Sequence, residues 1–281
     1  MKEITKRILT GIIYIGVILA ATCINLLVSA FLLTGISVLA LLEFYKNADL
    51  LGIKTQKVTG ILISFCFMTF MSYSAFLNYL YSGVYAKMLI LLLSAAFVCF
   101  AFISIYELFR KTETPFSNIA YTILGVLYTS VPFGIAILQL GYNGFHPLNL
   151  LSLFIFVWCN DTFAYLVGCK WGKNRICERI SPKKSWEGFA GGLIATQIAA
   201  IIIWYLTDKL PLWHWIVTGL IMTVFGTLGD LVESMFKRQV GVKDSGDILP
   251  GHGGILDRFD SMLIALPVIF IFIQLENVFM N

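Results

Sequence analysis

Long apolar runs constrain this chain more than any other feature of its sequence. They lie at residues 8–23, 24–45, 58–80, 86–109, 117–140, 148–168, 187–207, 212–235 and 261–279. Most reach the roughly 20 residues that a helix needs to cross a hydrocarbon core about 30 Å thick. Lipid offers the backbone no hydrogen-bond partners, so such runs can span a membrane only as helices, and the alternating segments of a β-barrel are absent. We therefore predict an all-α, polytopic membrane protein with about nine transmembrane helices.

The composition excludes a soluble globular protein. Of the 281 residues, 58% are hydrophobic and 13% are charged, whereas a soluble domain is about half apolar and a quarter charged. Three basic residues precede the first run (Lys2, Lys6 and Arg7), as they would in a signal peptide. Because further apolar runs follow at once, we expect an uncleaved first span. Whether residues 1–45 form two full spans stays open, since little separates the first two runs.

The distribution of Lys and Arg predicts the orientation. With nine spans and a cytosolic N-terminus, 18 of the 20 basic residues lie on the cytosolic side, and only Lys87 and Lys209 lie outside. Cytosolic loops of membrane proteins carry such an excess of positive charge. We predict a multi-pass protein of the plasma (inner) membrane whose most polar segments face the cytosol.

One segment, residues 229–261, concentrates charge in an otherwise apolar sequence. It reads GDLVESMFKRQVGVKDSGDILPGHGGILDRFDS. In its first part Asp230, Ser234 and Lys237 are spaced by four and three residues, so they share one face of a helix with Glu233.

The second part of this segment combines a glycine-rich turn with two carboxylates. The turn at 250–254, Pro-Gly-His-Gly-Gly, cannot continue a helix, and its backbone N–H groups suit anionic oxygens. Asp257 and Asp260 follow at a spacing of three, which lets two carboxylates converge on one cation. Hard oxygen ligands, basic residues and such a turn are what a Mg²⁺-nucleotide site needs.

This string resembles the signature of the phosphatidate cytidylyltransferase (CDP-diglyceride synthase) family. The family pattern is S-x-x-K-R, four residues, K-D-x-G, a short gap, and P-x-H-G-G-x-x-D-R-x-D. The positions that match it are Ser234, Lys237, Arg238, Lys243, Asp244, Gly246, Pro250, His252, Gly253, Gly254, Asp257, Arg258 and Asp260. The resemblance implies that CTP and phosphatidic acid give CDP-diacylglycerol and pyrophosphate, with Mg²⁺ and possibly a second cation required. A charged cytosolic loop without catalytic function is the alternative.

A second polar segment lies nearer the middle of the chain. Asp161 falls inside an apolar run, where a lone carboxylate costs about 2.5–3.5 kcal/mol on insertion scales and suggests function. A polar patch for helix packing is the other interpretation. The loop 169–187 follows, with six basic residues against two acidic ones. Its end, SPKKSWEG at 181–188, resembles the same family, and we expect Ser and Lys side chains there at a helix N-terminus that favours phosphate. Gly188 and Gly192 allow close helix packing.

These patterns assign roles to individual residues. For the metal we select Asp230, Asp257 and Asp260, and for a further catalytic carboxylate Asp161. For phosphate binding, and in the case of Lys237 also catalysis, we select Lys183, Lys184, Lys237, Arg238, Lys243 and Arg258. For orienting the nucleotide or the lipid head group we select Ser185, Ser234, Asp244, His252, Gly253 and Gly254. Which basic residue faces CTP and which faces the lipid stays open.

The two halves of the chain differ in chemistry. We interpret residues 1–140 as a scaffold of about five helices, a dimer surface or part of a lipid-access path, and residues 141–281 as the catalytic region with cytosolic loops 169–187 and 236–260. Glu43 and Glu107 end two spans beside basic residues, so we expect them to snorkel or to be paired. The expected partners are CTP, phosphatidic acid, the lipid bilayer and a second copy in a homodimer, with no nucleic acid.

Two other functions remain as alternatives. A CTP-dependent polyprenol or lipid kinase would use the same nucleotide and transfer its γ-phosphate, but the complete signature argues against it. An ion-coupled transporter would place charges near the membrane midplane and break paired helices in two similar halves. Here the carboxylates gather toward the cytosolic ends of the runs, and the two halves are unlike.

Overall fold

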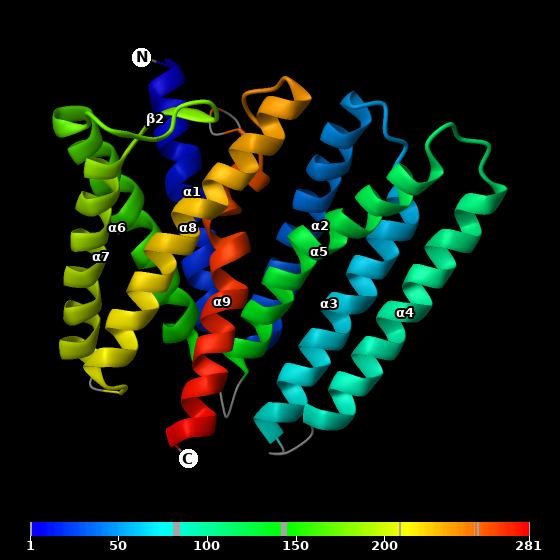
Figure 1. Cartoon of the computed structure of the whole chain (residues 1–281). Helices are drawn as coiled ribbons and strands as arrows, with labels where there is room; N and C mark the ends of the chain where they lie inside the picture. The colour runs from blue at the N-terminus through cyan, green and yellow to red at the C-terminus, as the bar shows by residue number, and fades with distance from the viewer. Residues whose placement is uncertain are drawn as a thin grey trace. The chain divides into compact units, whose positions relative to one another are not determined.

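A computed structural model describes residues 2–80, 85–141, 145–207, 209–249, 251 and 253–280. In these residues the chain forms helices and one short β-hairpin (Figure 1). The first five helices are α1 (Lys2–Ile24), α2 (Leu26–Leu50), α3 (Lys57–Leu80), α4 (Tyr85–Phe109) and α5 (Pro115–Leu140). The remaining elements are α6 (Pro147–Trp171), β1 (Arg175–Cys177), β2 (Ser181–Ser185), α7 (Trp186–Thr207), α8 (Leu212–Val240) and α9 (Leu256–Met280).

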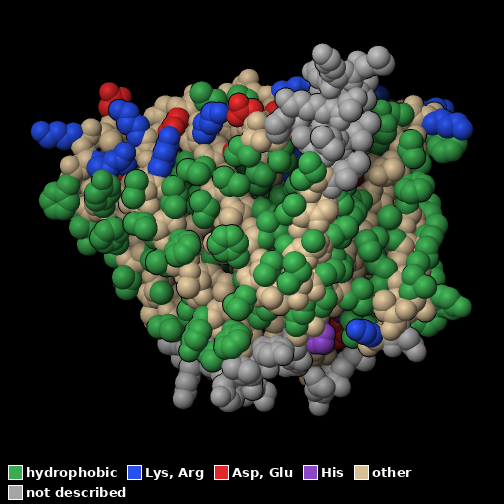
Figure 2. All heavy atoms as spheres, turned by 180° about the vertical axis from the view of Figure 1, so that it is seen from behind, with side chains coloured by type: hydrophobic (Ala, Val, Ile, Leu, Met, Phe, Trp, Pro, Cys, Tyr) green, Lys and Arg blue, Asp and Glu red, His purple; other side chains and the backbone are tan. Residues whose placement is uncertain are grey.

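The predicted membrane architecture is confirmed. Nine helices coincide with the nine apolar runs, and seven of them are long and apolar enough to cross a membrane among the residues described. Hydrophobic side chains cover most of the face shown in Figure 2. Large apolar side chains such as Phe31 (85% exposed) and Tyr205 (80% exposed) lie on helix surfaces. A soluble protein would bury such residues, whereas lipid accommodates them.

The first two runs are separate helices. Only Asn25 lies between α1 and α2, and its side chain accepts a hydrogen bond of 2.9 Å from the backbone N–H of Val28. This is N-capping, in which a side-chain oxygen satisfies one of the free N–H groups at the start of a helix. One capping residue is therefore enough to divide residues 1–45 into two helices.

The hairpin corrects one expectation. We expected the lysines of 181–188 at a helix N-terminus, but Ser181–Ser185 is strand β2, antiparallel to β1, and the helix begins at Trp186. The backbone N–H of Trp186 donates to the carbonyl of Asn174 at 2.9 Å, closing the base of the hairpin. Pairing with β1 satisfies backbone groups that an open loop would leave to water.

The chain divides into two compact units. The first contains residues 1–147 and 242–258, and the second contains residues 148–241 and 259–281. The segment 242–258, which carries most of the glycine-rich signature, therefore belongs to the unit built from the first five helices. Helix α9 begins in the first unit and continues into the second.

The first unit is organised around α2, α3 and α5. Tyr45 of α2 is fully buried, and its hydroxyl donates to the carbonyl of Thr122 in α5 at 2.7 Å. Gly60 of α3 and Gly125 of α5 lie against its ring, where a Cβ would overlap it. Small residues at these positions let helices approach closely in a membrane protein.

Glu107 joins three helices of this unit. It is 2% exposed and accepts hydrogen bonds from Gln56 (2.7 Å), Arg110 (2.8 Å) and Asn118 (2.8 Å). Thr112 donates at 2.8 Å to Oε1, the oxygen that also accepts from Asn118. The expectation of pairing is confirmed for Glu107, and snorkelling is wrong because the carboxylate is buried.

The second unit places α7 closely against α6. A Cβ on Gly188 would lie 2.7 Å from the carbonyl oxygen of Ala164, and one on Gly192 would lie 2.9 Å from that of Asn160. The predicted close packing at Gly188 and Gly192 is therefore confirmed. Phe154 of α6 meets Phe259 of α9 edge to face, with ring centroids 6.3 Å apart.

Candidate active site

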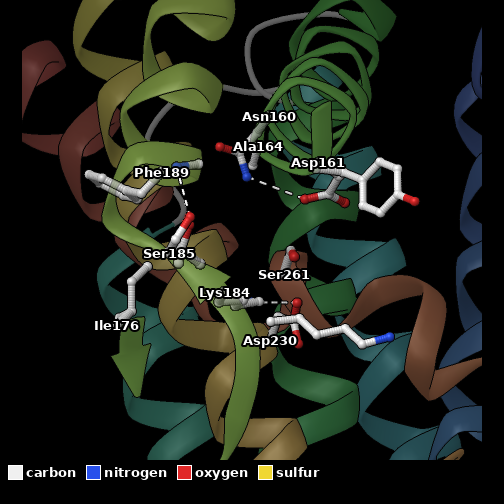
Figure 3. Close-up of a pocket in the computed structure, with 13 residues that line it drawn as sticks. Asn160, Asp161, Ala164, Ile176, Lys184, Ser185, Phe189, Asp230 and Ser261 are labelled. Atoms are coloured by element: carbon white, nitrogen blue, oxygen red, sulfur yellow. Dashed lines mark hydrogen bonds and ion pairs between the residues drawn. The ribbon is translucent and has the colours of Figure 1, made fainter. Parts of the chain in front are cut away.

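A cavity of about 260 Å³ lies within the second unit. Its walls come from α6, the hairpin, α7, α8 and the start of α9 (Figure 3). The lining residues are Asn160, Asp161, Ala164, Tyr165, Ile176, Lys183, Lys184, Ser185, Gly188, Phe189, Thr227, Asp230 and Ser261. Five of the residues selected from the sequence, namely Asp161, Lys183, Lys184, Ser185 and Asp230, are thus brought to one cavity.

Helix α8 supplies a ladder of polar side chains at its C-terminal end. Ser234 donates to Asp230 at 3.1 Å, and Lys237 donates to Glu233 at 3.0 Å. Both pairs are four residues apart, which places their members on neighbouring turns. The predicted shared face is confirmed. Glu233 is fully buried.

Helix α8 ends at a glycine that stops it. Gly241 follows the last residue of α8 with a φ of 80°, a left-handed conformation in which glycine has no Cβ penalty. Its N–H donates to the carbonyl of Arg238, whose Nε in turn donates to the carbonyl of Ile180 at 3.4 Å. Arg238 therefore connects the end of α8 to the hairpin.

Lys184 on β2 forms an ion pair with Asp230 on α8, as Figure 3 shows. Both side chains are partly exposed, at 24% and 30%, so they face the cavity and are not sealed in the core. A lysine ammonium and a carboxylate at one cavity wall can exchange partners when an anionic ligand or a cation enters.

Ser185 is the N-cap of α7. Its hydroxyl accepts a hydrogen bond of 3.1 Å from the N–H of Gly188, and the residue is 3% exposed. Glu187, in the first turn, accepts from the N–H groups of Lys173 (3.1 Å) and Asn174 (3.2 Å). These contacts fix the junction between α6, the hairpin and α7.

Asp260 lies within electrostatic reach of three other carboxylates. The charges of Asp230, Glu233 and Asp161 act on its carboxylate, and the backbone N–H of Ser261 donates to it at 2.5 Å. Asn160 donates to Asp161 at 3.3 Å. Close approach of like charges is unfavourable, so the group gains from any cation that shares it.

The chemistry of this group fits a hard divalent cation. Mg²⁺ is bound through carboxylate oxygens, often only one or two, together with substrate phosphates. Lys184 pairs with Asp230 and Lys237 pairs with Glu233, so two of the four carboxylates have a lysine partner. Among the residues that the structure describes, no three acidic, His or Cys side chains already converge at coordination distance. Asp230 and Asp260 are the residues that would hold such a cation.

Asp257 belongs to the first unit and organises its own turn. Its Oδ2 accepts hydrogen bonds from the N–H groups of Ser245 (2.9 Å) and Gly254 (2.8 Å). Gly253 has a φ of 87°, and a Cβ there would lie 2.9 Å from the same oxygen. The N–H of Leu249 donates to the Gly253 carbonyl at 3.0 Å, which closes the turn. Gly253, one of the glycines expected to bind substrate, is therefore also required by the backbone conformation of the turn.

The other selected residues lie at the surface or outside the described chain. Lys243, Asp244 and Arg258 are exposed in the first unit. Pro250 and His252 lie outside the described residues.

Sequence reasoning missed two buried glutamates at or near these groups. Glu233 appeared only as a rung of the ladder, although it is fully buried beside Lys237. Glu43 of α2 was expected to snorkel or pair with a cation, but it accepts hydrogen bonds from the backbone of Ile255 and Leu256. A carboxylate inside an apolar run is the signal that could have found it.

Comparison with known proteins decides the family. The family model described as "Cytidylyltransferase family" matches residues 5–276. The chain belongs to this family. A Bacillus subtilis protein named phosphatidate cytidylyltransferase is 31% identical to it over 280 residues, covering 98% of this chain and 99% of the relative.

Staphylococcal members of the cytidylyltransferase family are more similar over a shorter region. Proteins named phosphatidate cytidylyltransferase from Staphylococcus haemolyticus and Staphylococcus saprophyticus are 43% and 42% identical over 165 residues. These alignments cover 58% of this chain and 62% of each relative's length.

Proposed function

We propose that the protein is a phosphatidate cytidylyltransferase of the plasma membrane, which converts CTP and phosphatidic acid into CDP-diacylglycerol and pyrophosphate. The observation that carries this proposal is the cavity that combines Lys183 and Lys184 with Asp161 and Asp230. Cationic side chains attract phosphates, and carboxylates accept the cation that accompanies a nucleoside triphosphate. The names of the full-length and staphylococcal relatives support the same reaction.

The location of the cavity suits one lipid substrate and one water-soluble substrate. It lies in the second unit where α6 ends and α7 begins, two helices that are long and apolar enough to span a membrane. Moving a phospholipid into water is costly, because each buried CH₂ group is worth about 0.8 kcal/mol. A cavity among helix ends lets the acyl chains stay in lipid while the phosphate reaches polar side chains.

The reaction is a displacement at phosphorus. A phosphate oxygen of phosphatidate forms a bond to the α-phosphorus of CTP, and the bond from that phosphorus to the β-phosphate oxygen breaks. Pyrophosphate leaves with the electron pair of the broken bond. Because the attacking oxygen is already anionic, alignment and charge neutralisation contribute more than proton removal.

The residues of the cavity have distinct tasks in this proposal. Lys184 moves from Asp230 to a substrate phosphate, while Lys183, on the same strand, holds a second phosphate. Asp230 and Asp260, with Asp161 nearby, would hold Mg²⁺ and possibly a second cation. When bound, Mg²⁺ supplies charge neutralisation on the triphosphate. Ser185 fixes the strand by capping α7 and so orients both lysines.

Two further features belong to the proposal. We expect a homodimer, and we expect the cytosolic face of the membrane to carry the cavity, because CTP is found there and most Lys and Arg residues fall on that side of the predicted topology.

The proposal is tested by incubating purified protein with CTP, phosphatidate and Mg²⁺. Mass spectrometry of the lipid fraction should find CDP-diacylglycerol, and one pyrophosphate should be released for each lipid formed. Formation of CDP and a lipid that carries an added phosphate would instead identify a CTP-dependent lipid kinase.

A further inference from the structure

Glu43 of α2 accepts hydrogen bonds from the first turn of a helix that lies far away in the sequence. Its Oε1 accepts from the N–H of Ile255 at 3.0 Å and its Oε2 from the N–H of Leu256 at 2.8 Å, across sequence separations of 212 and 213 residues. Leu256 is the first residue of α9. The first N–H groups of a helix have no partner within the helix, and the helix dipole favours negative charge there. Glu43 thus caps α9 from outside the local sequence.

Two glycines lie in close contact with the Glu43 carboxylate. A Cβ on Gly254 would lie 2.7 Å from its Oε1, and a Cβ on Gly246 would lie 2.7 Å from its Cδ. Glu43 itself is only 3% exposed. Neither glycine is among the described residues with a positive φ. A glycine is therefore needed at these two positions because a side chain would overlap the carboxylate, and not because of the backbone conformation. Two turns of the signature segment therefore close directly around one buried carboxylate.

A second contact from the same face of α2 reaches the same segment. Asn47 lies one turn after Glu43, and its amide donates to the carbonyl of Ser245 at 2.9 Å. The N–H of Ser245 donates to Asp257, which also accepts from the N–H of Gly254. Glu43, Asn47 and Asp257 thus hold the segment 242–258 through backbone groups at several points.

We propose that Glu43 is a positioning residue for the nucleotidyl transfer, an inference that rests on the proposed function. It fixes the start of α9, and Asp260, which the proposed function assigns to the cation, lies on this helix about one turn after Leu256. Each oxygen of the Glu43 carboxylate accepts a hydrogen bond from one backbone N–H group. Both oxygens are therefore needed for the cap. Glu43 touches no substrate in this proposal and acts through the start of α9.

The competing interpretation is that Glu43 only stabilises the fold, and Glu107 provides the matched control. Both are glutamates of the first unit, 3% and 2% exposed, and each accepts several hydrogen bonds. The partners of Glu107 lie on α3, α4 and α5 or beside them, and none belongs to the segment 242–258. Glu→Gln at each position keeps the shape and replaces one acceptor oxygen with an NH₂ donor.

The first readout is kinetic. Glu43→Gln should lower kcat about tenfold or more, the scale of a lost hydrogen bond to a charged group, while KM for CTP changes less than about twofold. Glu107→Gln should lower thermal stability at least as much and leave kcat of the folded protein within about twofold. Equal effects of the two variants on kcat would reduce Glu43 to a structural residue and overturn the proposal.

The second readout does not depend on activity. Hydrogen–deuterium exchange of the peptide containing Ile255 and Leu256 should be faster in Glu43→Gln than in the original protein, and unchanged in Glu107→Gln. Unchanged exchange in Glu43→Gln would contradict the cap itself. If the original protein forms no CDP-diacylglycerol while exchange responds as expected, the proposed function fails and the cap does not.

A double-mutant cycle tests the contact from the other side, and its Gly254→Ala single variant keeps Glu43 and so covers a Glu43→Gln variant that fails to fold. Gly254→Ala should reduce kcat when Glu43 is present, because the new Cβ meets its carboxylate. In a Glu43→Ala background the same change should cost clearly less, since the side chain it meets is gone. Additive effects of the two substitutions would show that the contact does not exist in the working protein.

Discussion

Lys184 in β2 and Asp230 in α8 lie 46 positions apart in the chain and form an ion pair at the wall of the same cavity. The pair joins the two polar segments that the sequence separates, the basic loop before α7 and the start of the signature. In the proposed function, it places a lysine that would bind phosphate beside a carboxylate that would bind the metal.

Lys184→Gln should therefore raise KM for CTP or for phosphatidate by about tenfold. A tenfold change corresponds to about 1.4 kcal/mol, which is the scale of one charge-assisted contact. Steady-state kinetics with each substrate varied in turn will identify which one Lys184 binds. Lys170→Gln is the control, because it removes the same charge at the end of α6 but lies outside the cavity, over the ring of Trp171. Equal behaviour of the two variants would mean that the loop charges serve only membrane orientation.

Removal of divalent cations should abolish activity. EDTA should stop product formation and Mg²⁺ should restore it, because carboxylate oxygens such as those of Asp230 and Asp260 are the ligands that Mg²⁺ prefers. Asp260→Asn should lower kcat by more than about 10²-fold, the scale of one preorganised charge contact in an active site. Asp247→Asn, at a carboxylate that is 92% exposed, should change kcat little. Full activity in EDTA would refute the assignment of a metal.

Close packing of α7 against α6 should be sensitive to a single methyl group. Gly192→Ala places a Cβ 2.9 Å from the carbonyl oxygen of Asn160, so the helices must separate, at a cost of about 1–3 kcal/mol. Gly35→Ala is the matched control, since no atom lies within 4 Å of its added Cβ and alanine favours a helix by up to about 1 kcal/mol. Thermal unfolding in detergent should fall for the first variant and not for the second. A stable Gly192→Ala protein would contradict the tight contact.

The cavity should be open to water on one side of the membrane. In a background without the native cysteines, Ala164→Cys should react with a membrane-impermeant thiol reagent, and CTP with Mg²⁺ should protect it, because Ala164 lines the cavity. Ile201→Cys should stay unreactive, since Ile201 is 46% exposed in the apolar helix α7, where we expect its side chain to face lipid. Equal reactivity at both positions, or none at Ala164, would exclude an open cavity.

The sequence predicted the helices well because their signal is local. Apolar runs of sufficient length define membrane spans one at a time, and the ladder from Asp230 to Lys237 follows from helical spacing alone. The hairpin at 175–185 was missed because its strands are three and five residues long and rich in charge, which reads as a loop.

The site was predictable only in part because its decisive contacts are long-range. The pairing of Lys184 with Asp230 and the capping of α9 by Glu43 join segments 46 and more than 200 residues apart. Glu43 lies in an apolar run beside Lys46, so its local sequence suggests an ion pair or a snorkelling side chain. Only the fold brings it to the free N–H groups of Ile255 and Leu256.

The central claim, transfer of a cytidylyl group to phosphatidate, is tested most directly by following the phosphates of CTP. Purified protein should be incubated with phosphatidate, Mg²⁺ and CTP labelled either at the α-phosphate or at the γ-phosphate, and the lipid extracted. Because the proposed attack is at the α-phosphorus, label from the α-position should enter the lipid and label from the γ-position should be recovered in pyrophosphate. Lipid that carries the γ-label would contradict the account and identify a kinase.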